Sequence, residues 1–535
     1  MVMILISLIL SQVVRWELQL PHHGYPEWAR DPLILLGGKL IFGSHMSFGL
    51  PDTIDSIRSF CTMVDTATGA IIWDTELREP DWSIITTLTG DGDCFYAGGY
   101  GGKQDTNGEL LAWNLFVAKL NSSGDILWVR HHGDFAQTIR IVGQAAMVDP
   151  GGNLVCGGTG SAPGRGGLAL RSWDHDGNFR WQFFYEPPPG WGPYQNIWGL
   201  RMDDEGSIYG VGTYDAPSAG KQIPRILITQ EDYGNFAKRS SRNLPCDYPA
   251  IFKVDSAGHL VWVDTYKWWN KDGELTVCEY WDNGLYVAGM THCGGKLYNG
   301  RVDKYGGLLW YRWDELYNFF INIDASCLDS AGNFYITGDA SDSTGMYAFV
   351  ASHNPQGKRR ILQVFFPGTG WALASDRLGN IFLGGTIVDS LGNEFAVAKM
   401  DTLGNLKWLY RKDGESPWPG IYGDACYSLL PDNHGGVFAM GRLFMADSTA
   451  VQYLVHLADT TGGISEGSES ERGLVLTPAP SGFLISGYEG EARVYDPAGR
   501  LILTREIKSK ALISPLKPGV YFVVAGRQRA KVAVR

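Results

Sequence analysis

Few residues in this chain of 535 have the chemistry for catalysis or metal binding, and they are not grouped. The eleven histidines include two adjacent pairs, His22-His23 and His131-His132. Neither pair has partner carboxylates at the spacing that a zinc site requires, so we expect solvated side chains on or beside hairpin loops. The histidines therefore predict no metal site.

Two acidic stretches resemble fragments of calcium-binding loops: Asp91-Gly-Asp93 and Asp174-His-Asp-Gly-Asn178. Neither is followed by the bidentate glutamate that completes an EF-hand loop. The second coincides with a repeated turn, which favours a structural role. A His-Glu-x-x-His motif and a phosphate-binding loop are also missing from the sequence. We predict no catalytic residue and no cofactor.

Aromatic side chains are the strongest candidates for ligand binding. They occur in the longer loops, on the face expected to lie opposite the tight turns: Trp191, Tyr194, Trp268, Trp269, Trp313, Trp418 and Tyr422. Exposed aromatics on one face can stack on sugars or contact a partner protein. The alternative is that these rings only cover the cores between neighbouring sheets.

The composition indicates the type of secondary structure that these loops connect. Glycine accounts for 69 residues and tryptophan for 19, while only 19 % of residues are charged. This balance is typical of an all-β chain with many tight turns. The net charge of −12 argues against a nucleic-acid partner, because binding phosphates requires clustered lysine and arginine.

Two short repeats alternate along most of the chain. The first is an Asp or Asn turn ending in glycine, with tryptophan four residues later, as in Asp65-Thr-Ala-Thr-Gly69-Ala-Ile-Ile-Trp73. The second is Asp-x-x-Gly-Asn followed by an apolar run ending in glycine, as in Asp329–Gly338. Each glycine supplies the positive φ of a hairpin. One pair of repeats makes four strands over about 40–55 residues, which predicts a β-propeller.

The two ends of the repeat region each hold one unpartnered strand, residues 13–20 and 451–459. Pairing these strands would complete the last blade and remove two exposed sheet edges. The repeats then predict an eight-bladed propeller, with seven blades as the alternative.

The sequence divides into four segments. Residues 1–12 resemble the apolar part of a signal peptide, although a buried first strand is the alternative. Residues 13–459 form the predicted propeller, and the Gly/Ser/Glu-rich residues 460–473 form a linker. Residues 474–535 form a separate domain, and the change to a net positive charge near 472 supports this boundary. No other segment reaches 18 uninterrupted apolar residues, so we expect no transmembrane segment in the mature chain.

The repeats resemble two known propeller families. The Asp-x-x-Gly-Asn turns and Ala-Lys-Leu-type strands are similar to the bacterial SBBP beta-propeller repeat over most of 13–463. Asp65–Trp73 resembles the tryptophan-docking motif of pyrroloquinoline-quinone dehydrogenases, which have eight blades. The eight cysteines include no adjacent pair of the kind found in the alcohol dehydrogenases, so this resemblance implies shape and not catalysis. Cys246 and Cys293 are the candidates for a disulfide.

The last 60 residues resemble a different family. Leu476-Thr-Pro-Ala-Pro, Val494-Tyr-Asp-Pro-Ala-Gly-Arg and Leu516-Lys-Pro-Gly-Val-Tyr-Phe are similar to the C-terminal sorting domain of the type IX secretion system. The usual Pro-Asn-Pro is Pro478-Ala-Pro480 here. The resemblance implies that 474–535 is a small β-sandwich that the type IX machinery recognises, and that the protein is secreted or held on the outer cell surface. The alternative is an ordinary β-sandwich accessory domain.

The sequence therefore predicts a secreted or cell-surface propeller that acts as a non-catalytic binding or structural module. The ligand expected is a carbohydrate or a surface protein. The alternative is an extracellular polysaccharide hydrolase or lyase with its site on the loop face.

Overall fold

The computed structural model divides into two compact units, residues 1–460 and 461–535. In the first unit the structure describes residues 12–20, 33–50, 53–79, 82–91, 94–104, 110–131, 140–162, 165–185, 195–215, 247–265, 273–291, 296–315, 320–342, 345–389, 392–414, 423–445 and 450–459. In the second it describes residues 475–479, 482–486, 490–495, 501–508, 510–513, 519–525 and 528–534.

The described residues of the first unit are β-strands and turns. The strands of its first half are β1 (Gln12–Gln19), β2 (Leu33–Leu36), β3 (Lys39–Leu50), β4 (Thr53–Asp65), β5 (Ile71–Leu77), β6 (Trp82–Asp91), β7 (Cys94–Gln104), β8 (Leu110–Asn121), β9 (Ile126–His131), β10 (Arg140–Val148), β11 (Leu154–Ala162), β12 (Arg165–Trp173), β13 (Phe179–Tyr185), β14 (Gln195–Met202), β15 (Ile208–Asp215), β16 (Asp247–Val254) and β17 (Leu260–Thr265). Those of its second half are β18 (Gly273–Trp281), β19 (Gly284–Thr291), β20 (Lys296–Asp303), β21 (Leu308–Glu315), β22 (Phe320–Leu328), β23 (Phe334–Asp342), β24 (Gly345–His353), β25 (Arg359–Ser375), β26 (Asn380–Asp389), β27 (Gly392–Asp401), β28 (Leu406–Lys412), β29 (Ala425–Pro431), β30 (Val437–Phe444) and β31 (Ala450–Asp459).

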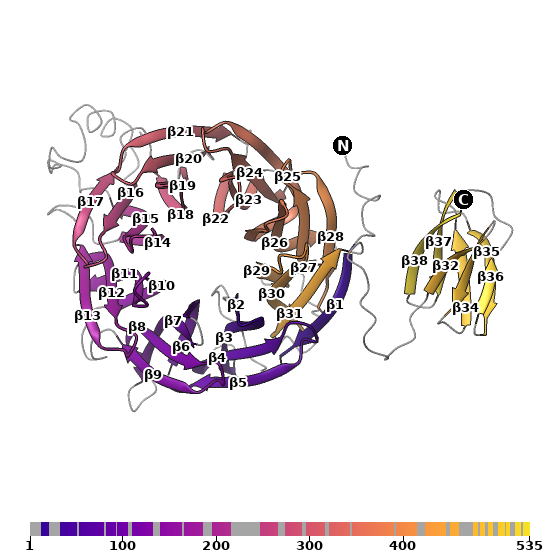
Figure 1. Ribbon diagram of the computed structural model, residues 1–535, viewed down its shortest axis with the longest axis horizontal. Coiled ribbons are helices and arrows are strands. Elements are labelled where there is room, and N and C mark those ends of the chain that lie inside the picture. The colour runs from indigo at the N-terminus through magenta and orange to yellow at the C-terminus, as the bar shows by residue number, and fades with distance from the viewer. Residues whose placement is uncertain are drawn as a thin grey trace. The chain divides into compact units, whose positions relative to one another are not determined.

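These strands form antiparallel sheets in chain order. Five sheets contain four consecutive strands each, from β2–β5 to β18–β21, and β22–β28 form one seven-stranded sheet because the long β25 belongs to both its halves. A further sheet has the order β1-β31-β30-β29, with Gln12 opposite Asp459. The sheets follow one another around a ring, with β6, β10, β14 and β18 innermost and β5, β9, β13 and β17 outermost (Figure 1). The all-β class is confirmed, and the sheets are consistent with a propeller.

The hydrophobic core lies between neighbouring sheets. One cluster joins Ile41 and Met63, from β3 and β4, to Leu88 and Phe95, from β6 and β7. Similar clusters recur between the later sheets. The buried residues face alternately the preceding and the following sheet, as the two-residue period of a strand requires.

The repeated turns have the expected geometry. Asp329 shows it well, because its Oδ1 accepts hydrogen bonds from the main-chain N–H groups of Ala331 and Asn333, both at 2.9 Å. Asn333 Nδ2 donates to the other carboxylate oxygen at 2.7 Å. Gly332, with φ +75°, occupies the left-handed corner. An aspartate side chain caps such turns from within, and Asn121 and Asn354 take its place in two of them.

The tryptophans of the first repeat form what we call the tryptophan belt, on the outermost strands. In six of them the indole Nε1 donates to a main-chain carbonyl in the turn of the next sheet, and Trp408 Nε1 donates to the carboxylate of Asp459, the last residue of β31. The pairs are Trp16–Thr66, Trp73–Ser122, Trp128–His175, Trp181–Ser256, Trp262–Lys304, Trp310–Pro355 and Trp408–Asp459, at 2.8–3.3 Å. The next turn's glycine packs on the ring. A Cβ at Gly258 would lie 2.7 Å from the Trp181 ring, so this close approach requires glycine.

The second unit is a small β-structure with one core. Its strands are β32 (Val475–Ala479), β33 (Gly482–Ser486), β34 (Gly490–Tyr495), β35 (Leu501–Ile507), β36 (Lys510–Ile513), β37 (Gly519–Ala525) and β38 (Gln528–Val534). They form a three-stranded sheet, β32-β33-β36, and a four-stranded sheet, β35-β34-β37-β38. Phe483 and Ile485 from the first sheet pack with Val494 and Val523 from the second.

Candidate functional site

The innermost strands share an irregularity in their pairing with the next strand. Most outer strands have no such irregularity at the same position along the sheet. In β6, β10, β14, β18, β22, β25 and β29 the pairing with the next strand skips one residue, which forms a β-bulge. The described side chains at these bulges are Thr86, Trp198, Thr276, Asp324, Trp371 and Tyr427. We call these six residues the bulge tier. A bulge re-aims a side chain that the sheet would otherwise bury, and bulges are common beside binding sites.

Side chains of the bulge tier keep access to solvent. Trp198 is 41 % exposed, and the other five are partly exposed. On neighbouring innermost strands, the rings of Trp371 and Tyr427 lie 5.9 Å apart at 56°. Trp371 Nε1 donates to Thr386 Oγ1 at 3.3 Å, which fixes the indole. The guanidinium of Arg442 lies 5.1 Å from the centre of the Tyr427 ring. These contacts make a preformed aromatic surface.

Asp324 adds a carboxylate beside this aromatic surface. It lies on β22, the innermost strand that precedes the Trp371 segment in ring order. Two residues before it, Asn322 Nδ2 donates to both carboxylate oxygens of Asp339, at 3.2 and 3.3 Å. Burial raises the pKa of Asp339, and the Asn322 hydrogen bond offsets this only in part. Asp339 is only 6 % exposed, and the Oδ2 atom of Asp324 is buried, so these carboxyl groups lie mostly behind the surface.

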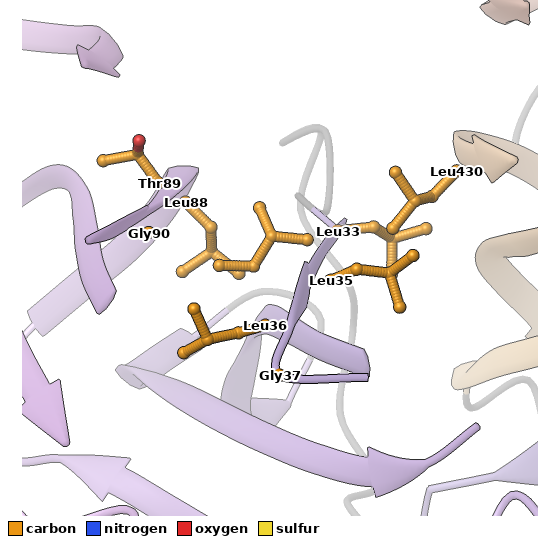
Figure 2. Close-up of a pocket in the computed structure, with 9 residues that line it drawn as sticks. Leu33, Leu35, Leu36, Gly37, Leu88, Thr89, Gly90 and Leu430 are labelled. Atoms are coloured by element: carbon orange, nitrogen blue, oxygen red, sulfur yellow. The ribbon is translucent and has the colours of Figure 1, made fainter. Parts of the chain in front are cut away.

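An apolar pocket of about 510 Å³ lies closer to the turns, between β2, β6 and β29. Figure 2 shows Leu33, Leu35, Leu36, Leu88 and Leu430 around it. The described part of β2 has only four residues, whereas β6 has ten. Thr89 is its one polar side chain among the lining residues. Ligand sites usually add several placed polar groups to an apolar lining, so the pocket alone offers little specificity.

Three other innermost strands carry polar side chains that bond to one another, and two of these side chains are charged. Arg201, on β14, donates to both carboxylate oxygens of Glu279, on β18, at 2.7 and 2.8 Å. Ser326 Oγ, on β22, donates to Glu279 at 2.9 Å. Burial alone would lower the pKa of Arg201, but the charge and hydrogen bonds of Glu279 raise it overall. The two opposite charges of this bidentate pair neutralise each other.

Asp424, just before β29, is a buried carboxylate that ties two segments together. It accepts hydrogen bonds from the N–H groups of Gly414 and Phe444, the latter at 2.7 Å. Burial raises its pKa to about 6, against the lowering effect of these two hydrogen bonds. The carboxylate therefore holds the start of an innermost strand in place, at an energetic cost in its ionised form.

The structure places one of the seven aromatic residues predicted to bind a ligand. Trp313 lies on β21, half-buried, with its ring 5.5 Å from that of Tyr298. Trp191, Tyr194, Trp268, Trp269, Trp418 and Tyr422 lie outside the described residues. The structure therefore shows Trp313 packed against a core cluster.

The remaining candidates for chemistry are accounted for as follows. The carboxylate of Asp174 accepts hydrogen bonds from Asp176 and Asn178, as in the other turns. His22, His23, His132, Asp93, Cys246 and Cys293 lie outside the described residues. The described cysteines are free thiols, and the described residues contain no group of three potential metal ligands. No helix in the described part of the chain could span a bilayer.

The bulge tier was not predicted from the sequence, although the sequence contains a spacing that marks it. Each bulged residue lies five positions before the first residue of the second-repeat turn, as Asp324 does before Asp329 and Trp371 before Asp376. A bulged residue has no characteristic residue type or spacing within its strand. It can be recognised only when the repeats are aligned and the register of the strands is known.

Comparison with known proteins gives only distant likenesses. No family model matches the chain, and no curated protein matches it in sequence. Among solved structures, the polysaccharide lyase Uly1 is 10 % identical, with a TM-score of 0.43, over 82 % of this chain and 92 % of that one. An oligogalacturonate lyase in complex with manganese is 14 % identical, with a TM-score of 0.39, over 78 % and 98 %. The dihydro-heme d1 dehydrogenase NirN is 11 % identical, with a TM-score of 0.41, over 94 % and 79 %. At these values the likenesses carry no argument about activity.

Proposed function

We propose that the first unit is an eight-bladed β-propeller that acts as a non-catalytic binding module on the cell surface or in secreted form. Eight groups of four strands support the count, when the two halves of β25 are assigned to separate blades. The pairing of β1 with β31 supports closure by the two ends of the repeat region. Seven blades with an added edge is the alternative.

The bulge tier is the observation that carries the binding role. Its residues lie on the innermost strands of successive blades, where a ligand at the centre could contact many of them at once. Trp198, Trp371 and Tyr427 are partly exposed aromatic residues whose rings a ligand could stack on. Sugars have apolar C–H faces and hydroxylated edges, which aromatic rings and hydrogen-bonding groups match. A carbohydrate is therefore the ligand class favoured over a protein.

Binding can be tested on the full chain by pull-down with a panel of insoluble polysaccharides, with released reducing ends assayed in parallel. We expect retention on at least one polysaccharide, loss of retention in a Trp198→Ala/Trp371→Ala double variant, and no release of sugar. Tyr305→Ala is the matched control, because Tyr305 is an aromatic side chain that is 78 % exposed on a turn. Sugar release would instead support the hydrolase or lyase alternative. Equal binding by all three proteins would contradict a site at the bulge tier.

We also propose that the second unit directs export through the type IX secretion machinery. The two small sheets with one core and the motifs of 476–522 support this proposal. Deletion of 474–535 should abolish delivery to the cell surface and leave the first unit folded inside the cell. Unchanged surface delivery of the shortened protein would refute the sorting role.

A further inference from the structure

Resting on the proposed carbohydrate-binding role, we propose that the bulge tier contains two separate aromatic subsites, and that its ligand is a chain of several sugar units that contacts both. The first subsite is the pair Trp371–Tyr427, and the second is Trp198. These three are the aromatic residues among the described side chains of the tier. A single sugar unit would occupy only one of the two subsites.

The two subsites lie at the same level along their strands. Trp198 precedes the turn residue Asp203 by five positions, as Tyr427 precedes the turn residue Asp432. In both innermost strands the pairing with the next strand skips the aromatic residue. An extended chain that crosses the ring at this level can therefore meet both subsites.

The two subsites are also far apart around the ring. β14, which carries Trp198, lies on the opposite side of the ring from β29, which carries Tyr427 (Figure 1). Because packed sheets lie about 10 Å apart, innermost strands three or four sheets apart in a ring are separated by on the order of 20 Å. That span is several times the length of one sugar unit, so the ligand must be an oligosaccharide or a longer chain.

The first subsite is formed before a ligand arrives. The rings of Trp371 and Tyr427 lie 5.9 Å apart, and Trp371 Nε1 donates to Thr386 Oγ1 at 3.3 Å. The guanidinium of Arg442 lies 5.1 Å from the centre of the Tyr427 ring. Stacking on side chains that are already held in place costs little side-chain entropy. We therefore expect short and long sugars to use this subsite alike.

Trp198 is held less firmly than the first subsite. Its side chain is 41 % exposed, and within the described part of the chain it has no hydrogen bond and no ring contact. A ligand that covers an exposed indole removes a large apolar surface from water. This gain is available only to a ligand that extends across the ring from the first subsite.

The strands between the two subsites add less to binding. Thr276 on β18 and Asp324 on β22 are the tier residues there, and the Oγ1 atom of Thr276 and the Oδ2 atom of Asp324 are buried. The main contacts then lie at two separate places on the ligand. When one chain joins two contacts, the second forms only if the chain is long enough to span them. We therefore expect affinity to rise abruptly at one chain length.

The test measures the affinity of the full chain for oligosaccharides of two to about eight units, prepared from cellulose, chitin and xylan and from each polysaccharide that retains the protein in the pull-down. We expect the longest oligomers of a series that binds to be held at least about tenfold more tightly than the shortest, a difference of about 1.4 kcal/mol. Trp198→Ala should remove this gain and leave the shortest oligomers within about twofold. Trp371→Ala should weaken binding at every length.

Two further variants serve as controls. Trp198→Phe should keep most of the gain, because it retains a ring. Phe179→Ala should leave every affinity unchanged, because Phe179 is 54 % exposed on β13, the outermost strand of the preceding sheet.

Three results would count against the inference. Equal losses at every length in Trp198→Ala, no loss at all, or a gradual rise of affinity with length would each overturn the two subsites and leave the binding role standing. Failure of every polysaccharide and oligosaccharide to bind would instead refute the proposed function and this inference with it.

Discussion

The outermost and innermost strands of the first unit differ in how strictly they repeat. On the outermost strands, equivalent positions hold tryptophan seven times, and Ile361 takes the place of an eighth. On the innermost strands, the bulged positions hold threonine, tryptophan, aspartate or tyrosine. The indoles of the belt bind main-chain or turn groups that every copy of the repeat provides. The bulge side chains have no such uniform partner.

This difference agrees with the proposed division of roles, in which the belt holds the ring together and the bulge tier binds a ligand. A contact made to backbone can be reused in each blade, so one residue type suffices. A ligand bound at the centre would not repeat with the blades, so the residues facing it could differ from blade to blade. The comparison predicts that changes in the belt reduce stability, whereas changes in the bulge tier reduce binding.

Removal of a belt tryptophan should give the largest effect. Trp408 is fully buried and donates to Asp459 at 2.8 Å. We expect Trp408→Ala to lower the free energy of unfolding by about 3–5 kcal/mol, from lost apolar burial and the cavity left behind. Trp198→Ala, in the bulge tier, should cost about 1 kcal/mol or less, because that side chain is 41 % exposed. Urea unfolding followed by fluorescence measures both, and similar losses would break the comparison.

The next largest loss of stability should come from adding a Cβ to a turn glycine that packs on a belt tryptophan. Gly258 and Gly404 have nearly the same φ, +88° and +85°. A Cβ at Gly258 would lie 2.7 Å from the Trp181 ring, whereas at Gly404 the nearest atoms are side-chain atoms of Gln363 and Ile361 at 3.3 Å. Both alanine variants carry the left-handed strain of about 1–2 kcal/mol. Gly258→Ala should lose a further 1–3 kcal/mol, roughly, from overpacking.

Thermal unfolding of the two glycine variants measures this difference directly. The matched φ cancels the backbone strain, so the difference reports the contact with the indole. Equal shifts in midpoint temperature would mean that the belt tolerates a Cβ at each turn and contributes little to the assembly of neighbouring blades.

Stability should depend on pH in opposite directions for a turn carboxylate, Asp65, and for Asp424, the carboxylate beside an innermost strand. Hydrogen bonds from Lys39 and Thr68 lower the pKa of Asp65 to about 2. Its contribution is therefore present above the unfolded pKa of about 3.9 and is lost as the pH falls toward 2. Asp424 has its pKa raised to about 6 by burial. The folded form then holds the proton more tightly than the unfolded form, so stability falls as the pH rises from about 4 to 6.

Asp424 should account for a decrease of about 2–3 kcal/mol at most over that range, from its shift of about two pKa units. Urea midpoints measured at pH 4, 5, 6 and 7 test this, and Asp424→Asn should remove most of the slope between pH 4 and 6. A slope that persists in the variant would assign it to other groups.

The sequence predicted the outer part of this fold better than its centre. The spacing of Gly69 and Trp73, repeated along the chain, indicates four-stranded units because a turn glycine and an apolar alternation are local features. The pairing of residues 13–20 with 451–459 followed from two unmatched copies of the repeat, and β1 does pair with β31. The bulges at Asp324 and Trp371 depend on register between strands, which local patterns do not encode.

The smallest effect on stability is expected at the position where the belt lacks a tryptophan. Ile361 occupies its position and is 4 % exposed within a core cluster that includes Tyr335. The carbonyl of Thr402, which a docked indole would need by analogy with Ser256 or Pro355, already accepts a hydrogen bond from Tyr335 Oη at 3.4 Å. At this junction β25 also runs unbroken from one sheet into the next. Ile361→Trp should therefore change stability by less than about 1 kcal/mol, because overpacking offsets the new contact. A clear gain in the urea midpoint would mean that the belt is incomplete here and that continuity of β25 does not replace the tryptophan.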